Sequence, residues 1–329
     1  MGELVICGAE KGRKRVLLLW HTINENFGDV LIYYTVKDFL EKKGCICSYM
    51  DVGKPCIEVI REANTYDFLL FAGGGIIERY VPNVIRYFDE DFKELKVPYG
   101  IIGLSVGNFD YSEYSKSIGC WIQNASFFYT RDEYSAKKLN QIAKTNKVVS
   151  GVDVVWSNKK INCRINEGLE NIGINVRNIP YLDMVPDFNW RMINDSVYNN
   201  DVSIQIPDES QIIIEGLKQY TYSVDEVIRQ IARCKYLVAM RYHVVLAAAM
   251  MGIPTIPIVY CNKVHELSMQ LNLSEYEVDL LQLEKLDFNM DKMKKNYDIV
   301  KNSIIKKTKE MKKCSLSILE NIADVIVAC

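Results

Sequence analysis

The feature that most constrains this chain is the stretch KYLVAMRYHVVLAAAMMGIPTIPIVYCNK, which begins at Lys235. Two short apolar runs, at residues 236–239 and 255–260, flank a longer apolar run at 244–251. Short runs without a breaker suit buried parallel strands, and the longer run suits a helix packed between layers. The Gly-Ile-Pro sequence at 252–254 is a helix stop signal. This stretch therefore predicts a strand–helix–strand unit of an α/β fold.

Polar side chains occupy the corner between the first predicted strand and its helix, where Arg241 is followed by Tyr242 and His243. In open α/β sheets, ligands bind at the carboxyl ends of strands, and the next helix offers its first N–H groups to an anion. Arg241 adds a planar cation, and His243 adds a group that can donate a proton near neutral pH. If strand geometry continues through the corner, both side chains point the same way. The corner therefore indicates an anion site beside a proton donor; the structural alternative is an arginine that ends a strand and a histidine that caps a helix.

The composition is that of a folded chain without a surplus of positive charge. Its 329 residues suffice for about two domains, with 49% hydrophobic residues, 25% charged residues and a formal net charge of -2. The charge balance disfavours a nucleic-acid-binding protein. Near the N-terminus, the apolar runs are too short for a membrane span and in the wrong order for a signal peptide. The ten cysteines are scattered, so we expect reduced and mostly structural thiols in a cytoplasmic protein.

The first half of the chain alternates predicted strands with predicted helices. The strands are expected at residues 15–20, 46–51, 66–72, 99–106 and 127–130, and the helices at 30–43, 56–63, 112–124 and 131–142. Repeated alternation of this kind predicts a parallel, doubly wound sheet.

Two stretches of this half follow a predicted strand and carry candidate ligand contacts. Asn26, Gly28 and Asp29 lie where the first strand passes to the first helix. The structural alternative to a ligand contact is that Asp29 is a helix N-cap or an acid in the first turn of the helix. The triplet Gly73-Gly74-Gly75 follows a later strand, and three residues without side chains let a ligand or another backbone approach closely. The spacing matches neither a phosphate loop nor a dinucleotide fingerprint.

The second half begins after a polar stretch at residues 157–170, which we interpret as a linker between two domains. A new apolar run at 172–176 precedes Arg177, and Arg131 likewise follows the predicted strand at 127–130. Cations at strand ends are candidates for binding an anionic ligand. Further elements are predicted as β-type runs at 202–206 and 211–214, and as helices at 224–234, with Ser223 as a cap, and at 262–271.

The last part of the chain, residues 283–329, is rich in lysine and has two helical patterns, the second at 316–327. We expect these helices to pack back across one domain with a solvated basic face. A membrane-surface role is the alternative, and acidic residues within the basic face count against it. The predicted organisation is therefore an N-terminal domain at 1–160, a C-terminal domain at 168–282 and terminal helices at 283–329.

These candidates form an ordered set that resembles a known family. In chain order they are Asn26-Phe-Gly-Asp29, Gly73-Gly-Gly75, Arg131-Asp132 with Ser135, Asp153, Arg177, Arg241-Tyr-His243, and Tyr260 with Lys263. Over roughly residues 15–275 the chain is similar to the polysaccharide pyruvyl transferase family. It departs from the family at Ala239, where a serine is usual two residues before the arginine.

The resemblance implies an α/β fold of two Rossmann-like domains whose parallel sheets face each other across a cleft, as in GT-B glycosyltransferases. It also implies the transfer of a pyruvyl group from phosphoenolpyruvate to two hydroxyls of a sugar in a polysaccharide or its precursor. The products would be a pyruvate ketal and phosphate. The donor would bind to the C-terminal domain and the acceptor to the N-terminal domain. No cofactor or metal is implied, and we expect none.

The resemblance also suggests roles for individual residues. Arg177 and Arg241 would bind the carboxylate and phosphate of the donor, and Lys263 would add charge at the phosphate end. Ketal formation requires protonation of the enol carbon, for which His243 is the candidate acid, and Asp29 is the candidate base or acceptor ligand. The acceptor side would comprise Asn26, Gly28, Gly73, Gly74, Gly75 and Arg131.

Two other functions remain open at this point. One is a GT-B-type glycosyltransferase that uses a nucleotide-sugar, whose diphosphate would bind at the cationic corner. The other is a non-catalytic sugar-binding protein that keeps the fold. We expect His21 and His265 to be structural or surface residues, and a cytoplasmic location with the inner face of the membrane as an option. The acceptor sugar, the bridged hydroxyls and the oligomeric state are not specified by the sequence.

Overall fold

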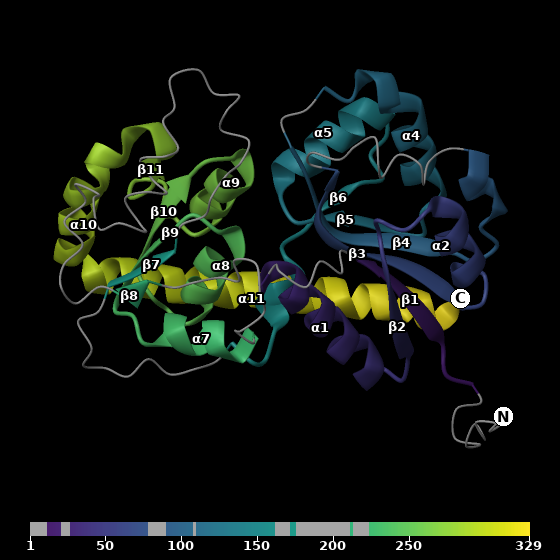
Figure 1. Ribbon diagram of the computed structural model, residues 1–329, viewed down its shortest axis with the longest axis horizontal. Helices are drawn as coiled ribbons and strands as arrows, with labels where there is room; N and C mark the ends of the chain where they lie inside the picture. The colour runs from purple at the N-terminus through teal and green to yellow at the C-terminus, as the bar shows by residue number, and fades with distance from the viewer. Residues whose placement is uncertain are drawn as a thin grey trace. The chain divides into compact units, whose positions relative to one another are not determined.

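A computed structural model describes residues 12–20, 27–77, 90–107, 110–161, 172–175, 211–212 and 224–329 of the chain. The chain divides into two compact units, each of which contains one parallel β-sheet (Figure 1). The first unit comprises Met1–Ile23, Asp29–Ser157 and Cys314–Cys329, and the second comprises Asn24–Gly28 and Asn158–Lys313.

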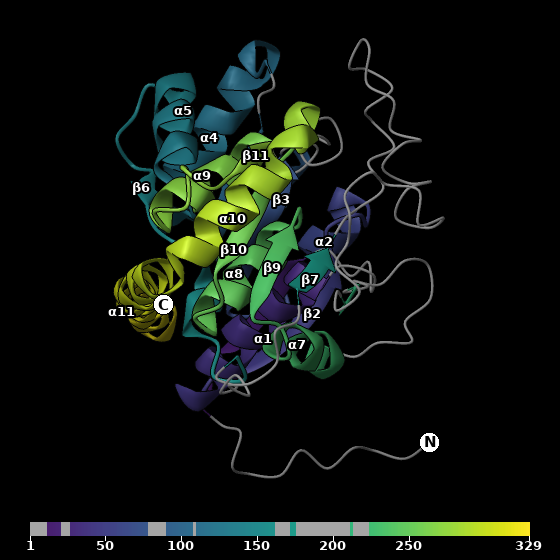
Figure 2. The same ribbon diagram turned by 90° about the vertical axis from the view of Figure 1, so that its left-hand side faces the viewer.

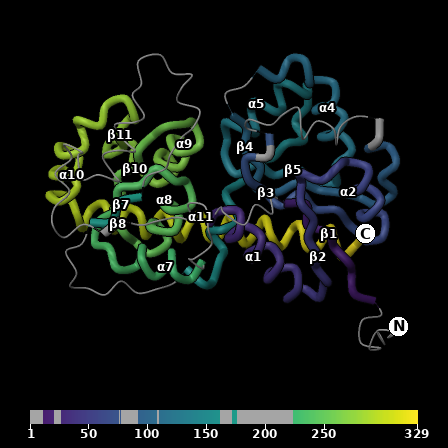
Figure 3. The backbone as a smooth tube through the Cα atoms, in the orientation of Figure 1, coloured from purple at the N-terminus to yellow at the C-terminus, as the bar shows by residue number. Residues whose placement is uncertain are grey.

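The sheet of the first unit has six strands in the order β2-β1-β3-β4-β5-β6, and every described pairing is parallel. The strands are β1 (Arg15–Trp20), β2 (Ile46–Asp51), β3 (Phe68–Ile77), β4 (Tyr99–Val106), β5 (Phe128–Thr130) and β6 (Val149–Ser150). The helices between them are α1 (Phe27–Lys42), α2 (Cys56–Ala63), α4 (Ser115–Asn124) and α5 (Glu133–Ala143). The tube in Figure 3 follows this alternation, which confirms the predicted doubly wound sheet.

The core of the first unit lies along its central strands. All eight residues of β4 are buried, as expected for a parallel strand covered on both faces. On β3, the ring of Phe71 meets that of Trp121 edge-on at 5.3 Å between centroids, and Trp121 meets Phe128 at 4.9 Å. Edge-to-face ring pairs contribute stabilisation in addition to that from buried apolar area. These contacts therefore hold α4 firmly against the sheet.

The prediction that β3 ends at Ala72 is wrong, because the strand continues through the glycine triplet to Ile77. Gly73 and Gly74 have φ values of +78° and +87°, a region that residues with side chains rarely adopt. The pairing with β4 shifts register between Gly74 and Ile77. The glycines therefore form an irregularity inside the strand rather than a turn after it.

The sheet of the second unit has five parallel strands in the order β11-β10-β9-β7-β8, of which β7 and β9 lie side by side in Figure 2. The strands are β7 (Ile172–Asn175), β8 (Gln211–Ile212), β9 (Tyr236–Ala239), β10 (Thr255–Val259) and β11 (Val278–Asp279). The helices are α7 (Val224–Ala232), α8 (Tyr242–Met250), α9 (Asn262–Gln270) and α10 (Leu286–Lys295). The predicted strand–helix–strand unit is thereby confirmed as β9, α8 and β10.

Helix α8 differs from the prediction at its start and agrees with it at its end. It begins at Tyr242 instead of 244, so strand alternation does not extend to His243. Its first eight residues are buried, as expected for a helix between layers. At its end, Gly252 has a φ of +71°, which is the left-handed conformation expected of a glycine after a helix.

Two helical patterns were predicted within residues 283–329, the second at 316–327. The structure instead extends that second helix back to residue 297: beyond α10 it has one continuous helix, α11 (Tyr297–Ala328), of 32 residues, seen nearly end-on in Figure 2. No glycine or proline interrupts residues 297–328, so nothing in the sequence breaks the helix. In the second unit, Thr308 Oγ1 of α11 donates to Ala249 O at 2.9 Å. In the first unit, Ser315 Oγ donates to Val154 O at 3.0 Å.

Several predicted features lie outside the described residues. They are His21, Asn26, Arg177, the run at 202–206 and the cap at Ser223. In the described part of the chain, every helix is too short or too polar to cross a membrane.

Candidate functional site

The corner before α8 is held by the neighbouring strand β7. Arg241 is the N-cap residue, with extended backbone at φ -80° and ψ 126°. Its N–H donates to Asn175 Oδ1 at 3.3 Å, and the N–H of Met240 donates to Asn175 O at 2.9 Å. Asn175 is the last residue of β7 and is 1% exposed. One buried asparagine therefore fixes the backbone from which Arg241 projects, a role that the sequence analysis did not identify.

His243 lies in the first turn of α8 and is 8% exposed. Its ring meets that of Tyr242 edge-on at 5.0 Å between centroids. On another side it meets the backbone of Gly28, where an added Cβ would overlap the Nδ1, Cγ and Cε1 atoms of the imidazole. Gly28 belongs to the second unit, as His243 does. The structure thus brings together two of the candidate residues, and glycine is required at position 28 because only hydrogen fits there.

Helices α8 and α9 both begin without a cap from the side chain of their own N-cap residue. The side chains of their N-cap residues, Arg241 and Cys261, make no cap hydrogen bond. Lys263 follows in the first turn of α9 and is half-buried. Helix α8 follows β9 and helix α9 follows β10, and these two strands are parallel neighbours. The first N–H groups of both helices, together with Arg241 and Lys263, therefore lie at the carboxyl edge of one sheet. This edge has the charge and the donors that a small polyanion needs.

In the first unit, Asp29 lies in the first turn of α1, as its structural alternative predicted. An added Cβ on Gly74 would come within 3.4 Å of Asp29 Oδ1. The carboxylate therefore stands over the glycine triplet at the carboxyl end of β3, and Gly75 beside it is half-buried. The triplet leaves this carboxylate without a neighbouring side chain from positions 73–75, so Asp29 is placed to accept a proton or hydrogen bond from a hydroxyl.

Arg131 is buried, with its side chain 3% exposed. One terminal nitrogen lies 3.7 Å from Asp153 Oδ2, and the other donates to Ser105 Oγ. Asp153 Oδ1 in turn accepts from the N–H of Val155 at 2.9 Å. This polar cluster joins the ends of β4 and β5 to the segment after β6. Contact between Arg131 and the acceptor stays a prediction, since the structure contains no acceptor.

The motif residues after Arg131 also support the local backbone. Asp132 caps α5 by accepting from the N–H of Ser135 at 2.7 Å. Ser135 Oγ accepts from the N–H of Val106 at 3.0 Å, which ties α5 to the end of β4. A capped α5 contrasts with α8 and α9, whose N-cap side chains make no cap hydrogen bond.

His265 and the cysteines complete the set of groups that could take part in chemistry. His265 Nδ1 lies 2.8 Å from Glu277 Oε1 in the second unit, so the expected surface histidine is hydrogen-bonded to a carboxylate. Burial raises the pKa of the Cys47 and Cys234 thiols to about 12 in each case, which keeps them protonated. Among the described residues, no three His, Cys, Asp or Glu side chains are grouped as metal ligands.

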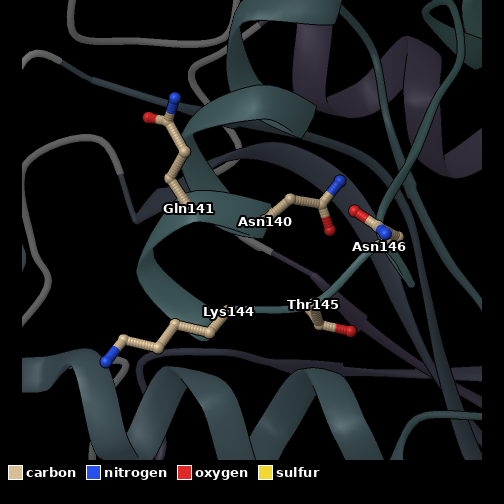
Figure 4. Close-up of a pocket in the computed structure, with 5 residues that line it drawn as sticks. All are labelled: Asn140, Gln141, Lys144, Thr145 and Asn146. Atoms are coloured by element: carbon tan, nitrogen blue, oxygen red, sulfur yellow. The ribbon is translucent and has the colours of Figure 1, made fainter.

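A hollow of about 300 Å³ lies away from these candidates. It is lined by Asn140, Gln141, Lys144, Thr145 and Asn146 at the C-terminal end of α5 (Figure 4). Because α5 starts at the carboxyl end of β5, the hollow is at the opposite end of the helix from that edge of the sheet. None of its residues was predicted from the sequence.

Solved structures with this fold include nucleotide-sugar enzymes. A putative UDP-N-acetylglucosamine 2-epimerase from Listeria monocytogenes matches with a TM-score of 0.60 and 10% identity over 96% of this chain and 98% of its own. The UDP-GlcNAc 2-epimerase from Neisseria meningitidis, bound to UDP-GlcNAc, matches at 0.54 and 12% identity over 94% and 100%. An α-glucosyltransferase in complex with UDP and DNA matches at 0.50 and 10% identity over 97% and 100%. The fold is therefore the α/β GT-B class with two parallel sheets, as predicted.

The sequence comparison is more specific than the fold. The family model described as polysaccharide pyruvyl transferase matches residues 26–262, which is most of the chain. The protein belongs to the polysaccharide pyruvyl transferase family. The comparison with curated proteins found no match.

Proposed function

We propose that the protein transfers a pyruvyl group from phosphoenolpyruvate to two hydroxyls of a sugar and releases phosphate. Membership of the family supports an enzyme that transfers pyruvyl groups to polysaccharide. The observation that carries the more specific proposal is the buried His243 in the first turn of α8, beside Arg241 and against Gly28. This arrangement puts a proton donor next to a cation and at the N-terminus of a helix.

The donor fits the charge of this edge of the second unit. Phosphoenolpyruvate carries a carboxylate and a phosphate on a small carbon frame. In the proposal, Arg241 and the first turn of α8 bind one of these groups, and Lys263 with the first turn of α9 binds the other. Arg177, which lies outside the described residues, is assigned to the same donor because it follows β7.

The chemistry needs one proton on carbon and two new bonds to oxygen. His243 protonates the methylene carbon of the enol, which becomes the methyl group, and positive charge develops on the adjacent carbon. The first sugar hydroxyl attacks that carbon and loses its proton. The carbon–oxygen bond to phosphate then breaks, the second hydroxyl attacks, and its proton leaves with phosphate. Low exposure of His243 suits this role, because a buried proton is delivered to carbon instead of being lost to water.

Asp29 is the proposed acceptor-side base, and the glycine triplet is the proposed surface for the sugar. Its carboxylate lies beside Gly74, which has no side chain. An acid in the first turn suits the positive end of the helix dipole, and carboxylate oxygens accept hydrogen bonds from hydroxyls. Asn26, Gly73, Gly75 and Arg131 are assigned to acceptor binding.

Sugar-dependent release of phosphate tests the proposal. The protein is incubated with phosphoenolpyruvate and a panel of lipid-linked and nucleotide-linked sugars, and free phosphate is followed. His243→Gln should abolish release, whereas His265→Gln, the matched control histidine, should leave it largely intact. Phosphate release that never depends on any sugar would refute pyruvyl transfer. Unchanged activity of His243→Gln would exclude this residue as the acid.

A nucleotide-sugar transferase is the second candidate, because two solved structures of this fold contain UDP or UDP-GlcNAc. The same cationic edge would then bind a diphosphate. Thermal-shift titrations separate the two. Stabilisation by phosphoenolpyruvate but not by nucleotide-sugars supports pyruvyl transfer, and the reverse supports glycosyl transfer. Stabilisation by neither, with function unaffected by His243→Gln, would point to a non-catalytic sugar-binding protein.

A further inference from the structure

The strongest unexplained feature of the chain is a concentration of positive charge at the end of α10 and in the first half of α11. Residues 292–313 contain nine lysines and two acidic residues, whereas the whole chain has a formal net charge of -2. All of these residues belong to the second unit. The rest of the chain therefore has a surplus of acidic residues, whereas this segment is strongly basic.

Three of these lysines align along one exposed face of α11. Ile299, Asn302, Lys306, Lys309 and Lys313 are all exposed, and steps of three and four residues place them in one row, which we call the basic stripe. The row extends over about 21 Å at 1.5 Å per residue. The opposite face packs on the unit, where Val300 and Ile304 are 4% and 0% exposed. The basic stripe is thus turned to solvent by the packing of the helix.

The charge of the basic stripe is not neutralised within the described part of the chain. Lys306, Lys309 and Lys313 form no ion pair with any described residue. Glu310, the nearest acid on the helix, is paired with Lys307 at 3.2 Å. The stripe therefore presents an uncompensated positive field along the helix.

Large apolar side chains are exposed on the same two helices. Ile299, at the start of the basic stripe, is 71% exposed, and Phe288 on α10 is 72% exposed. Each is the most exposed apolar side chain of its helix among the described residues. Lysines beside exposed aromatic and aliphatic side chains are typical of helices that lie on a membrane surface, since the cations meet lipid phosphates and the apolar groups enter the acyl boundary.

We propose that the basic stripe, with the exposed Ile299 at its start, forms a docking surface for an anionic phospholipid membrane. Nucleic acid is the less suitable partner, because exposed Ile and Phe side chains gain nothing along a phosphate backbone and the remaining surface is acidic. The surface would hold the enzyme where lipid-linked substrates are found. Its existence is independent of the proposed reaction.

Vesicle flotation tests the docking surface without any substrate. Vesicles of phosphatidylcholine alone are compared with vesicles of equal parts phosphatidylcholine and phosphatidylglycerol. The variant Lys306→Gln/Lys309→Gln/Lys313→Gln should bind anionic vesicles on the order of a hundredfold more weakly, since each lysine near such a surface contributes about fivefold. Glutamine is nearly as good a helix former as lysine, so the variant should fold, which circular dichroism checks.

A matched control removes the same number of charges elsewhere. Lys96→Gln/Lys116→Gln/Lys137→Gln alters three exposed lysines of the first unit and should bind like the wild type. High salt screens the lysines, so any remaining binding to anionic vesicles should come from the apolar side chains. The double variant Ile299→Asn/Phe288→Asn should abolish this remaining binding. Equal losses in the two lysine variants, equal binding to neutral vesicles, or full displacement from vesicles by duplex DNA would each overturn the proposal.

Discussion

Replacing Gly28 by alanine tests the contact on which the proposed proton donor depends. A Cβ at this position would overlap three atoms of the His243 ring, which is 8% exposed. Gly28 is in the first turn of α1, so its backbone is held by the helix and the imidazole must move instead. A displaced ring no longer points its proton to the same place. The substitution therefore alters the position of His243 without touching its chemistry.

The expected magnitudes follow from two opposing effects. An extra methyl group in a packed interior costs about 1–3 kcal/mol. Alanine in a helix is favoured over glycine by about 0.5–1 kcal/mol. We expect a net loss of about 0–2.5 kcal/mol in the free energy of unfolding. Activity should suffer more, since a displacement of about 1 Å at a reacting group costs about a hundredfold.

Urea unfolding and sugar-dependent phosphate release measure the two effects separately. Gly119→Ala in α4 is the matched control, because its Cβ would meet no atom closer than 3.8 Å. It should gain about 0.5–1 kcal/mol of stability and keep full activity. If Gly28→Ala behaves like this control in both assays, His243 does not rest against Gly28 and the geometry proposed for the acid is wrong.

Three further predictions follow from buried polar groups. Arg131→Met leaves the buried Asp153 carboxylate without its cation, so urea unfolding should show a loss of about 3–5 kcal/mol, and a loss below about 1 kcal/mol would contradict the ion pair. Asn175→Ala removes the acceptor of the Arg241 N–H and should weaken phosphoenolpyruvate binding about tenfold in a thermal-shift titration, a result that unchanged affinity would exclude. The pKa of Cys234 is raised by burial from 9.0 to about 12, so its thiol stays protonated in the fold but ionises in the unfolded chain. The resulting contribution to stability is present below pH 9.0 and should be lost as the pH rises to about 12, whereas Cys234→Ala should not show this part of the decline.

The sequence was most informative where apolar runs determine the structure. The runs at β9, α8 and β10 were identified because strands and helices buried on all sides have few alternatives. The glycine triplet was placed after the strand, since glycine is unusual inside strands and only the tertiary pairing with β4 reveals that the strand continues irregularly through it. The uninterrupted α11 was divided in two because its apolar pattern changes where its packing surface changes, although no breaker is present.

In the candidate site, too, the sequence did not reveal contacts between distant residues. His243 and Arg241 were identified because they follow a predicted strand, but the residues that surround them were not identified. The contact between Gly28 and His243 joins residues far apart in the sequence, and a small residue gives no local sign of what lies against it. Asn175 is one polar residue at the end of an apolar run, and its hydrogen bond to the N–H of Arg241 depends on the pairing of β7 with β9.

The C-terminal part of α11 has a consequence for how the chain is made. Residues 314–329 are counted with the first unit, where Leu319, Ile322 and Ile326 are each 0% exposed. A nascent chain that has reached Ser157 has every strand of the first sheet, yet it lacks the helix that covers these contacts. The first unit to begin synthesis is thus completed late, because residues 314–329 must be made before Leu319, Ile322 and Ile326 can pack on it.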